Sequence, residues 1–219
     1  METNSEDITE PQEVAPQVEE ISRSTALRQA VIAVNDQRFP LLEMESSDCS
    51  VPLSADDEDA LSLMNDVMEE LNDEAAGLAA VQIGYPKRIF ILRKDGENVA
   101  YINPSIVAVS SSAKKDFEAC LSIPGGVVRT ARPKWVTLQF INIDGRVETE
   151  TFSGFWARAV MHEMDHLNGT LIVKYLEKEI SKRVNTTSFG MKVTPAKINQ
   201  IARRRAKNRR AKMARRTNR

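Results

Sequence analysis

The chain has 219 residues, of which 42% are apolar, and its formal net charge is −1. This length and apolar content suffice for one sizeable core, so we expect a single domain with appendages. No apolar run approaches the roughly 18 residues of a membrane span, which excludes membrane-spanning functions from the prediction.

The N-terminal segment is acidic. The first 25 residues contain seven acidic residues and one arginine, together with Pro11 and Pro16. They hold neither the apolar segment of a secretory signal nor the Arg-rich composition of a transit peptide. We therefore expect residues 1–24 to be disordered and the protein to be cytoplasmic. Two cysteines, Cys49 and Cys120, are too few for a disulfide framework of the secreted type.

An amphipathic helix is predicted between Ser54 and Asn72. Asp57 follows Ser54 by three positions, which is the pattern of a capping box. Apolar residues then recur at helical spacing, namely Leu61, Met64, Met68 and Leu71.

Several short apolar or β-branched runs predict antiparallel strands. The first three, at 88–92, 99–103 and 106–109, are separated by Asp95-Gly96 and by Pro104. Two more, at 135–143 and 147–152, flank Asp144-Gly145, a dipeptide typical of type I′ hairpins.

A last helix is predicted from Phe155 to Leu167, because its apolar residues recur on one flank and Gly169 follows its end. Strands and helices do not alternate as βαβ units. We therefore predict an α+β fold, with antiparallel β-sheets packed around this central helix and one further N-terminal amphipathic helix. The predicted domain spans residues 25–185.

Charge is segregated toward the C-terminus. Residues 192–219 contain twelve of the 30 Lys and Arg and no acidic residue, which leaves 18 basic against 31 acidic residues elsewhere, a formal charge of −13. We predict a separate basic tail at 186–219, helical or disordered, that is attracted to phosphates. The alternative is a tail that docks on the acidic body of its own chain.

Both histidines of the chain lie in one motif, His162-Glu163-Met164-Asp165-His166. Residues four apart project from one face of a helix, so the two imidazoles can bind one metal ion while Glu163 lies beside its open position. This is the arrangement of metal-assisted hydrolysis. The alternative is a solvated helix face that carries two histidines.

Such a site usually has a third protein ligand. Glu177 and Glu179 are candidates, but they lie only eleven and thirteen residues after His166. Cys120 is the better candidate, because residues 123–126, Ile-Pro-Gly-Gly, favour a loop that presents a thiolate together with backbone N–H groups.

Three ordered blocks carry further information. They are Gly77-Leu78-Ala79-Ala80-Val81-Gln82, Glu118-Ala119-Cys120-Leu121-Ser122 and the histidine motif. Together they resemble the peptide deformylase family over about residues 27–178. Two positions depart from the family, because Ala75 and Ala119 stand where it has glycine. A Cβ there restricts the backbone and narrows the approach of a bound peptide.

The resemblance implies that the chain hydrolyses the formyl group from the N-terminal formyl-methionine of nascent polypeptides. It implies Cys120, His162 and His166 as ligands of one divalent metal ion. Glu163 would accept a proton from water and later donate one to the leaving amine.

Further roles follow from the same resemblance. The side chain of Gln82 and the N–H of Leu121 would stabilise the oxyanion, while Gly77 and Ala119 would border the substrate. Glu118 is either a support for a ligand or an ordinary polar residue. Asp165 is likewise either an orienting group for an imidazole or a solvent-facing side chain.

Metal identity stays open between Fe(II), expected in vivo, and Zn(II) or Ni(II) as other occupants. The basic tail is expected to anchor the enzyme to the ribosome or its rRNA. Two competing functions are a different HExxH metallopeptidase and an RNA-binding or ribosome-binding protein with a decayed deformylase domain.

Overall fold

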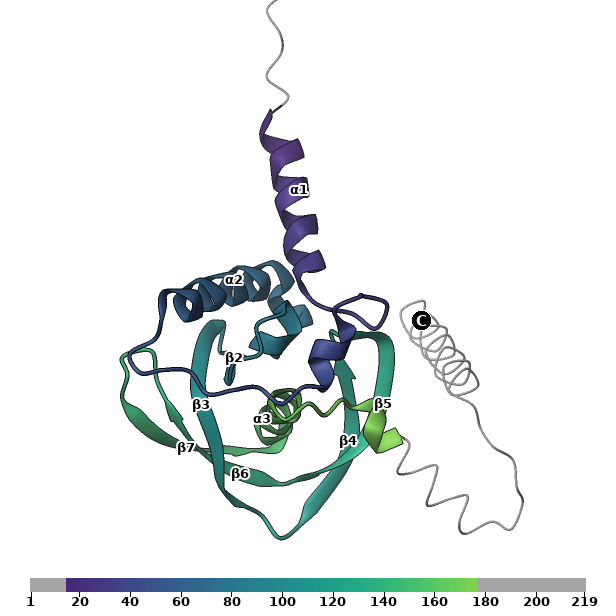
Figure 1. Cartoon of the computed structure of the whole chain (residues 1–219). Helices are drawn as coiled ribbons and strands as arrows, with labels where there is room; N and C mark the ends of the chain where they lie inside the picture. Colours follow the sequence, from purple (N-terminus) through teal and green to yellow (C-terminus); the bar gives the residue numbers. More distant parts are fainter. Residues whose placement is uncertain (1–14, 177–219) are drawn as a thin grey trace, which may run out of the picture.

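A computed structural model describes residues 15–176, arranged as strands around helix α3 with α2 on one side (Figure 1). The three α-helices are α1 (Ala15–Ala30), α2 (Ala55–Leu71) and α3 (Gly154–Leu167). The strands are β1 (Gly77–Ala79), β2 (Ile89–Lys94), β3 (Glu97–Val109), β4 (Ala113–Cys120), β5 (Ile123–Pro133), β6 (Trp135–Ile141) and β7 (Val147–Ser153). Short 3-10 helices lie at Phe39–Glu43, Asn72–Glu74 and Ala80–Ile83.

The strands form two antiparallel sheets. One has the order β1-β2-β3-β6-β7, and the other is the β4–β5 pair. The predicted α+β class with antiparallel sheets is therefore confirmed. Within the described part of the chain, β1 is an edge strand that pairs only with β2.

Helix α2 matches its prediction closely. Ser54 is the N-cap, its Oγ accepts a hydrogen bond from the N–H of Asp57, and the Asp57 carboxylate accepts one from the Ser54 N–H. The helix ends at Leu71, and Asn72 follows with a φ of 45°. Its buried face packs against Ile89 and Ile91 of β2 in a core cluster that also contains Cys49, which we call the second core cluster.

Helix α1 corrects the expected disorder of residues 15–24. Its C-terminal half is tied to the acidic helix α2 by three residues. Arg23 pairs with Asp66 at 3.3 Å, Ser24 donates to Glu70 at 2.6 Å, and Arg28 pairs with Glu70 at 3.0 Å. These partners lie over 40 residues away in the chain, so local composition did not reveal them. The rest of the N-terminal segment, residues 1–14, lies outside the described residues.

Strand β3 also differs from its prediction, because it joins two predicted strands into one. Its first half pairs with β2 and its second half with β6, with a register shift between Ile102 and Ser105. Pro104 falls in this irregularity, where its missing N–H costs no ladder hydrogen bond. Asn103 adopts a φ of 47°, and its side chain exchanges two hydrogen bonds with the backbone of Cys49.

The turn between β6 and β7 is not the type I′ turn predicted at Asp144-Gly145. Type I′ requires positive φ at both central residues, and only Gly145 has it, at 78°. The Asn142 side chain instead accepts from the N–H groups of Asp144 and Arg146. The type I′ pattern occurs at Asp95-Gly96, where φ is 52° and 86°.

Helix α3 packs into the main core as predicted. Its residues Ala157, Val160, Met164 and Leu167 are buried there, together with Phe90, Tyr101 and Phe140. The helix contacts strands of both sheets and ends before Gly169, whose φ is 62°. None of the helices within residues 15–176 is long and apolar enough to cross a membrane. The predicted domain end at residue 185 and the basic tail lie outside the described residues.

Candidate active site

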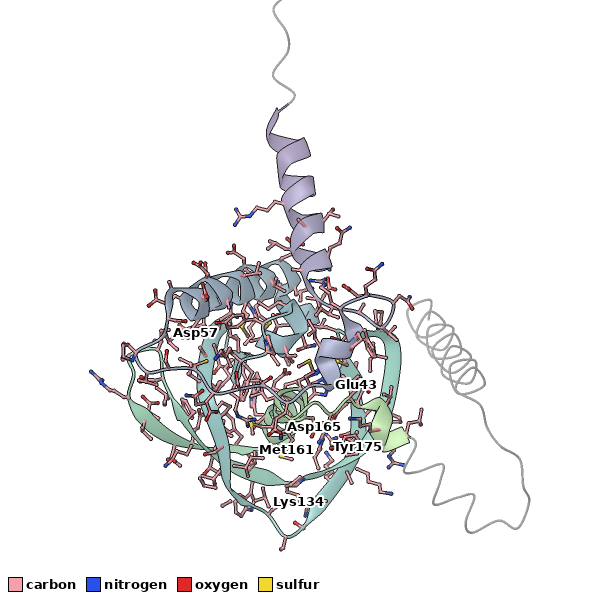
Figure 2. All side chains as sticks on the ribbon, viewed as in Figure 1. Glu43, Asp57, Lys134, Met161, Asp165 and Tyr175 are labelled. Atoms are coloured by element: carbon pink, nitrogen blue, oxygen red, sulfur yellow. The ribbon has the colours of Figure 1, made fainter. Side chains whose placement is uncertain are left out.

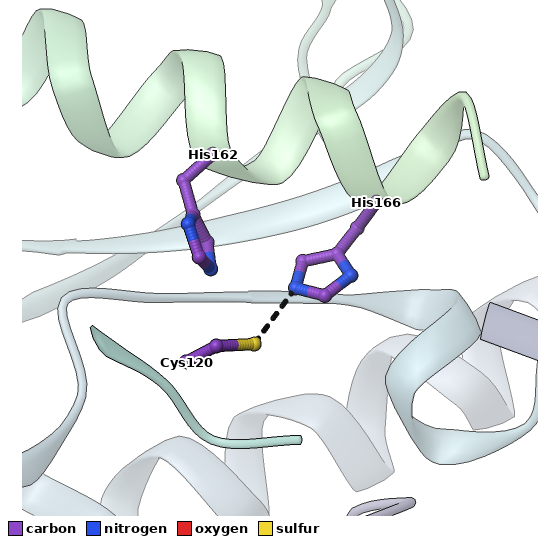
Figure 3. Close-up of side chains that lie close together, drawn as sticks. All are labelled: Cys120, His162 and His166. Carbon is purple, nitrogen blue, oxygen red and sulfur yellow. Dashed lines mark hydrogen bonds between the residues drawn. The ribbon is translucent and has the colours of Figure 1, made fainter. Parts of the chain in front are cut away.

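Three residues with metal-binding side chains meet where α3 faces the end of β4. His162 and His166 lie one turn apart on α3, and Cys120 is the last residue of β4 (Figure 3). One ligand atom from each lies within 4.8 Å of the others, and the Cys120 Sγ is 3.2 Å from the His166 Nε2. The predicted trio is thus brought together, whereas Glu177 and Glu179 lie outside the described residues.

The backbone around Cys120 explains how the thiol reaches the histidines. Residues 121–122 form a tight turn, and the β4–β5 register shifts between Ala119 and Cys120. The thiol is thereby turned inward, and Cys120 is only 7% exposed. Residues 123–126 begin β5 and are not the predicted loop, although only Ile123 of the four pairs with β4, opposite Cys120.

Glu163 lies in the same site and is buried. Its Oε2 has no hydrogen-bond partner among the described residues, and burial raises the pKa of its carboxyl to about 7. A Cβ at Gly77 would lie 2.7 Å from the Glu163 Oε1, so a larger residue there would displace this carboxylate. Glycine at position 77 therefore allows the Glu163 carboxylate to lie close to the backbone of β1.

Gln82 is held in a single orientation. Its Oε1 accepts from the N–H of Ala79 at 2.9 Å, which leaves the Nε2 to donate to the Ser122 Oγ at 3.1 Å. The Nε2 also lies 3.9 Å from the Cys120 Sγ. The amide donor consequently points toward the thiol. Ser122 holds the Gln82 amide in place, a role that the sequence did not predict for it.

Glu118 contacts the His162 ring at its Nδ1. Its Oε2 is 3.3 Å from the His162 Nδ1, which leaves the His162 Nε2 free to face a metal ion. Arg132 donates to both carboxylate oxygens at 2.8 and 2.9 Å. Although burial raises the pKa of Glu118, these contacts from Arg132 and His162 hold it well below its usual range.

Asp165 neither orients an imidazole directly nor faces solvent. It pairs with the Arg132 Nη1 at 2.7 Å and accepts from the Tyr175 hydroxyl at 2.8 Å. Asp165 and Tyr175 are labelled in Figure 2. Asp165 is therefore linked to His162 only indirectly, since it contacts Arg132, which contacts Glu118, which contacts His162. Sequence reasoning missed Arg132 and Tyr175 as parts of the site, because neither lies in a motif that carries chemistry.

A cleft of about 1080 Å³ opens onto these groups. Its lining includes Gly77 on the edge strand β1, Ala119 and Leu121 at the β4 turn, and Glu163 on α3. An extended peptide can lie along the free edge of β1 and hydrogen-bond to its backbone.

The two alanines that replace family glycines cause no backbone strain. Ala75 has φ −127° and ψ 132°, which any residue adopts. Ala119 lies in β4, and neither residue is among the non-glycine positions with positive φ. The concern that a Cβ restricts the backbone therefore does not apply at either position.

Comparison with known proteins agrees with this geometry. The sequence model of the polypeptide deformylase family matches residues 30–182. The chain belongs to the peptide deformylase family.

Individual deformylases give the same result. A peptide deformylase from Rhodopseudomonas palustris is 36% identical over 161 residues, covering 70% of this chain and 87% of that protein. The Met-Ala-Ser-bound class I type b peptide deformylase from Acinetobacter baumannii has a TM-score of 0.59 at 28% identity, covering 66% and 95% of the two chains. The actinonin complex from Synechococcus elongatus has a TM-score of 0.60 at 27% identity, covering 74% and 86%.

Membership of the deformylase family implies a divalent metal ion, and the donors of this chain fit one. A thiol sulfur and two imidazole nitrogens are accepted by zinc, iron and nickel alike. Ligand atoms bonded at about 2.0–2.3 Å to a common ion lie roughly 3–4 Å apart, which the observed cluster approaches. Burial lowers the pKa of His166, which favours the neutral ring that a metal requires. Burial also lowers the pKa of His162, but its contacts with Cys120 and Glu118 raise it to about 10, so metal binding there would displace a proton.

Proposed function

We propose that this chain hydrolyses the formyl group from the N-terminal formyl-methionine of nascent polypeptides and releases formate. One observation carries the proposal: the ligand atoms of Cys120, His162 and His166 converge beside a buried Glu163 at the end of a cleft. The Met-Ala-Ser bound to the Acinetobacter baumannii deformylase supports a short peptide beginning with methionine as the bound species.

Cys120, His162 and His166 would hold the metal ion in this account, with α3 as the central metal-binding helix. When bound, the ion supplies Lewis acidity, which makes water more acidic and a carbonyl carbon more electrophilic. The neighbouring protein groups perform the proton transfers and bind the substrate.

Glu163 is the general base and acid in this proposal. Its pKa, raised by burial to about 7, is suited to accepting a proton from water and returning one to the leaving amine. The partnerless Oε2 has no competing hydrogen bond among the described residues. Breaking the C–N bond of the formyl amide then yields formate and a free amino terminus.

Gln82 and Leu121 would stabilise the oxyanion. The Gln82 amide is fixed by Ala79, and one of its two N–H bonds goes to Ser122. The other points to the Cys120 Sγ at 3.9 Å and would turn to the oxyanion. The backbone N–H of Leu121 lies in the turn directly after Cys120 and would supply the second donor. Gly77 and Ala119 would border the peptide, on β1 and β4 respectively.

The proposed function is tested by formate release from formyl-Met-Ala-Ser. Protein stripped by a chelator should release no formate above background, and reconstitution should restore turnover. We expect anaerobic Fe(II) to give a higher rate than Zn(II) or Ni(II), as the resemblance to deformylases implies, although the ligand set accepts all three ions. Equal rates with the three ions would contradict the iron preference, and no formate with any of them would refute the function.

The basic tail is proposed to bind the ribosome or its rRNA in the cytoplasm. Its twelve Lys and Arg without an acidic residue provide sequence-independent attraction to phosphates. Truncation after Met191 should abolish salt-sensitive co-sedimentation with ribosomes and leave turnover of formyl-Met-Ala-Ser within about twofold, since the tail would raise local substrate concentration only. Co-sedimentation that is insensitive to both truncation and salt would disprove this role.

A further inference from the structure

The proposed metal ligands come from two separate parts of the fold. Cys120 belongs to the two-stranded β4–β5 sheet, whereas His162 and His166 belong to α3. The five-stranded sheet does not include β4 or β5. The geometry of the metal centre therefore depends on how firmly the hairpin is held to the helix.

Arg158 connects these two parts. It lies on α3, one turn before His162, and its side chain is 11% exposed. Its Nη1 donates to the Glu118 Oε1 at 2.7 Å and to the Thr130 Oγ1 at 2.6 Å, and its Nη2 donates to the Lys114 carbonyl at 2.8 Å. One guanidinium thus binds acceptors on both β4 and β5.

We propose that Arg158 is a positioning residue for the metal centre, which holds the Cys120 hairpin against α3 and fixes the carboxylate that orients His162. This inference rests on the proposed function, since it assumes the metal site. Arg158 acts through Glu118, whose second oxygen is 3.3 Å from the His162 Nδ1. Outer groups that orient a ligand imidazole contribute strongly to metal affinity.

Arg132 does not make Arg158 redundant. Arg132 belongs to β5, within the same hairpin as Glu118, and reaches α3 only at Asp165, near its C-terminal end. Arg158 provides the connection at the N-terminal side of His162. Without it, the first half of α3 would lose the guanidinium contacts to Glu118, Thr130 and Lys114, and the His162 contact should loosen more than that of His166.

Arginine is required for this role by its shape. A planar guanidinium presents several N–H donors in a fixed fork, so it can bind a carboxylate, a hydroxyl and a carbonyl at once. A lysine ammonium can reach one or two of these acceptors. Arg158→Met retains the apolar stem of the side chain and removes every donor, whereas Arg158→Lys retains the charge.

The test is a Co(II) titration against a competing chelator, together with the visible spectrum of the bound ion. We expect Arg158→Met to bind Co(II) about 10–100-fold more weakly than the wild type, with a changed spectrum, and Arg158→Lys to fall between them. Arg93→Met is the matched control. Arg93 is 13% exposed and ties β2 to α2 through Glu69, outside the cleft, so its loss should leave Co(II) affinity within about twofold.

The outcomes separate this inference from the proposed function. Wild-type chain that binds no Co(II) would overturn the metal centre and with it the role of Arg158. Wild-type affinity and spectrum in folded Arg158→Met would overturn the role of Arg158 alone. If circular dichroism shows that the Met variant is unfolded, Arg158→Lys decides in the same way, by intermediate affinity or by wild-type affinity.

Discussion

Replacing Glu163 with glutamine is expected to lower formate release from formyl-Met-Ala-Ser by about 10²–10⁴-fold, because the amide cannot accept the proton of the attacking water. The variant should fold and retain its metal. The Glu163 Oε2 has no hydrogen-bond partner to lose among the described residues, and the amide has nearly the same shape. The measurement is turnover normalised to bound metal, with the substrate at saturation.

Glu148→Gln is the matched control for this prediction. Glu148 lies on β7, is exposed, and does not line the cleft, so its neutralisation should leave turnover within about twofold. A Glu163→Gln protein that retains its metal and releases formate at more than half the wild-type rate would remove Glu163 from the proposed proton transfers.

Replacing Cys120 with alanine is expected to abolish both tight metal binding and formate release. Two imidazoles remain in the variant, but the sulfur that completes the trio is gone, and a metal ion held by two protein ligands exchanges readily. The measurement is metal content after gel filtration, determined by elemental analysis, together with formate release by the same sample.

Cys49→Ala provides a control of the same chemistry. Cys49 is also buried and also a free thiol, but it lies in the second core cluster and outside the cleft. Its alanine variant should retain its metal and its turnover. Metal and activity that survive in Cys120→Ala would instead indicate an HExxH enzyme whose third ligand is another residue.

The parts of the fold that sequence predicted best are those specified locally. The Ser54–Asp57 capping box needs only residues three apart, and α2 begins where it predicts. The histidines are four apart on α3, so their shared face follows from helix geometry. The third ligand was predicted from the scarcity of alternatives and from the loop-forming residues after Cys120, and the resemblance then implied the same residue. Periodicity did not reveal the hairpin through which Cys120 reaches the histidines.

Strands β4 and β5 were missed for a physical reason. The sequence of β4 contains Lys114, Lys115 and Asp116, and charged residues are depleted in strands. The start of β5 contains Pro124, Gly125 and Gly126, which read locally as a loop. Pairing of residues 113–119 with residues 127–133 outweighs the preference of the charged residues, while Pro124, Gly125 and Gly126 lie at the register shift and have no partner in β4.

The supports of the site were also beyond sequence reasoning. Arg132 and Arg158 lie on different elements, and each reaches Glu118 only after the chain has folded. Their spacing along the chain contains no period that would associate them. The ion-paired contacts of α1 with α2 are of the same kind, since charge alone does not choose between partners.

The central claim is that one sulfur and two nitrogens of this chain bind one divalent ion. The most direct measurement is the near-ultraviolet absorption of Co(II)-loaded protein, in which a cobalt-bound thiolate produces a charge-transfer band. We predict one Co(II) per chain and a band that persists in Cys49→Ala but is absent in Cys120→Ala. Stoichiometric Co(II) without a thiolate band in the wild type, or a band that survives the loss of Cys120, would contradict the proposed centre.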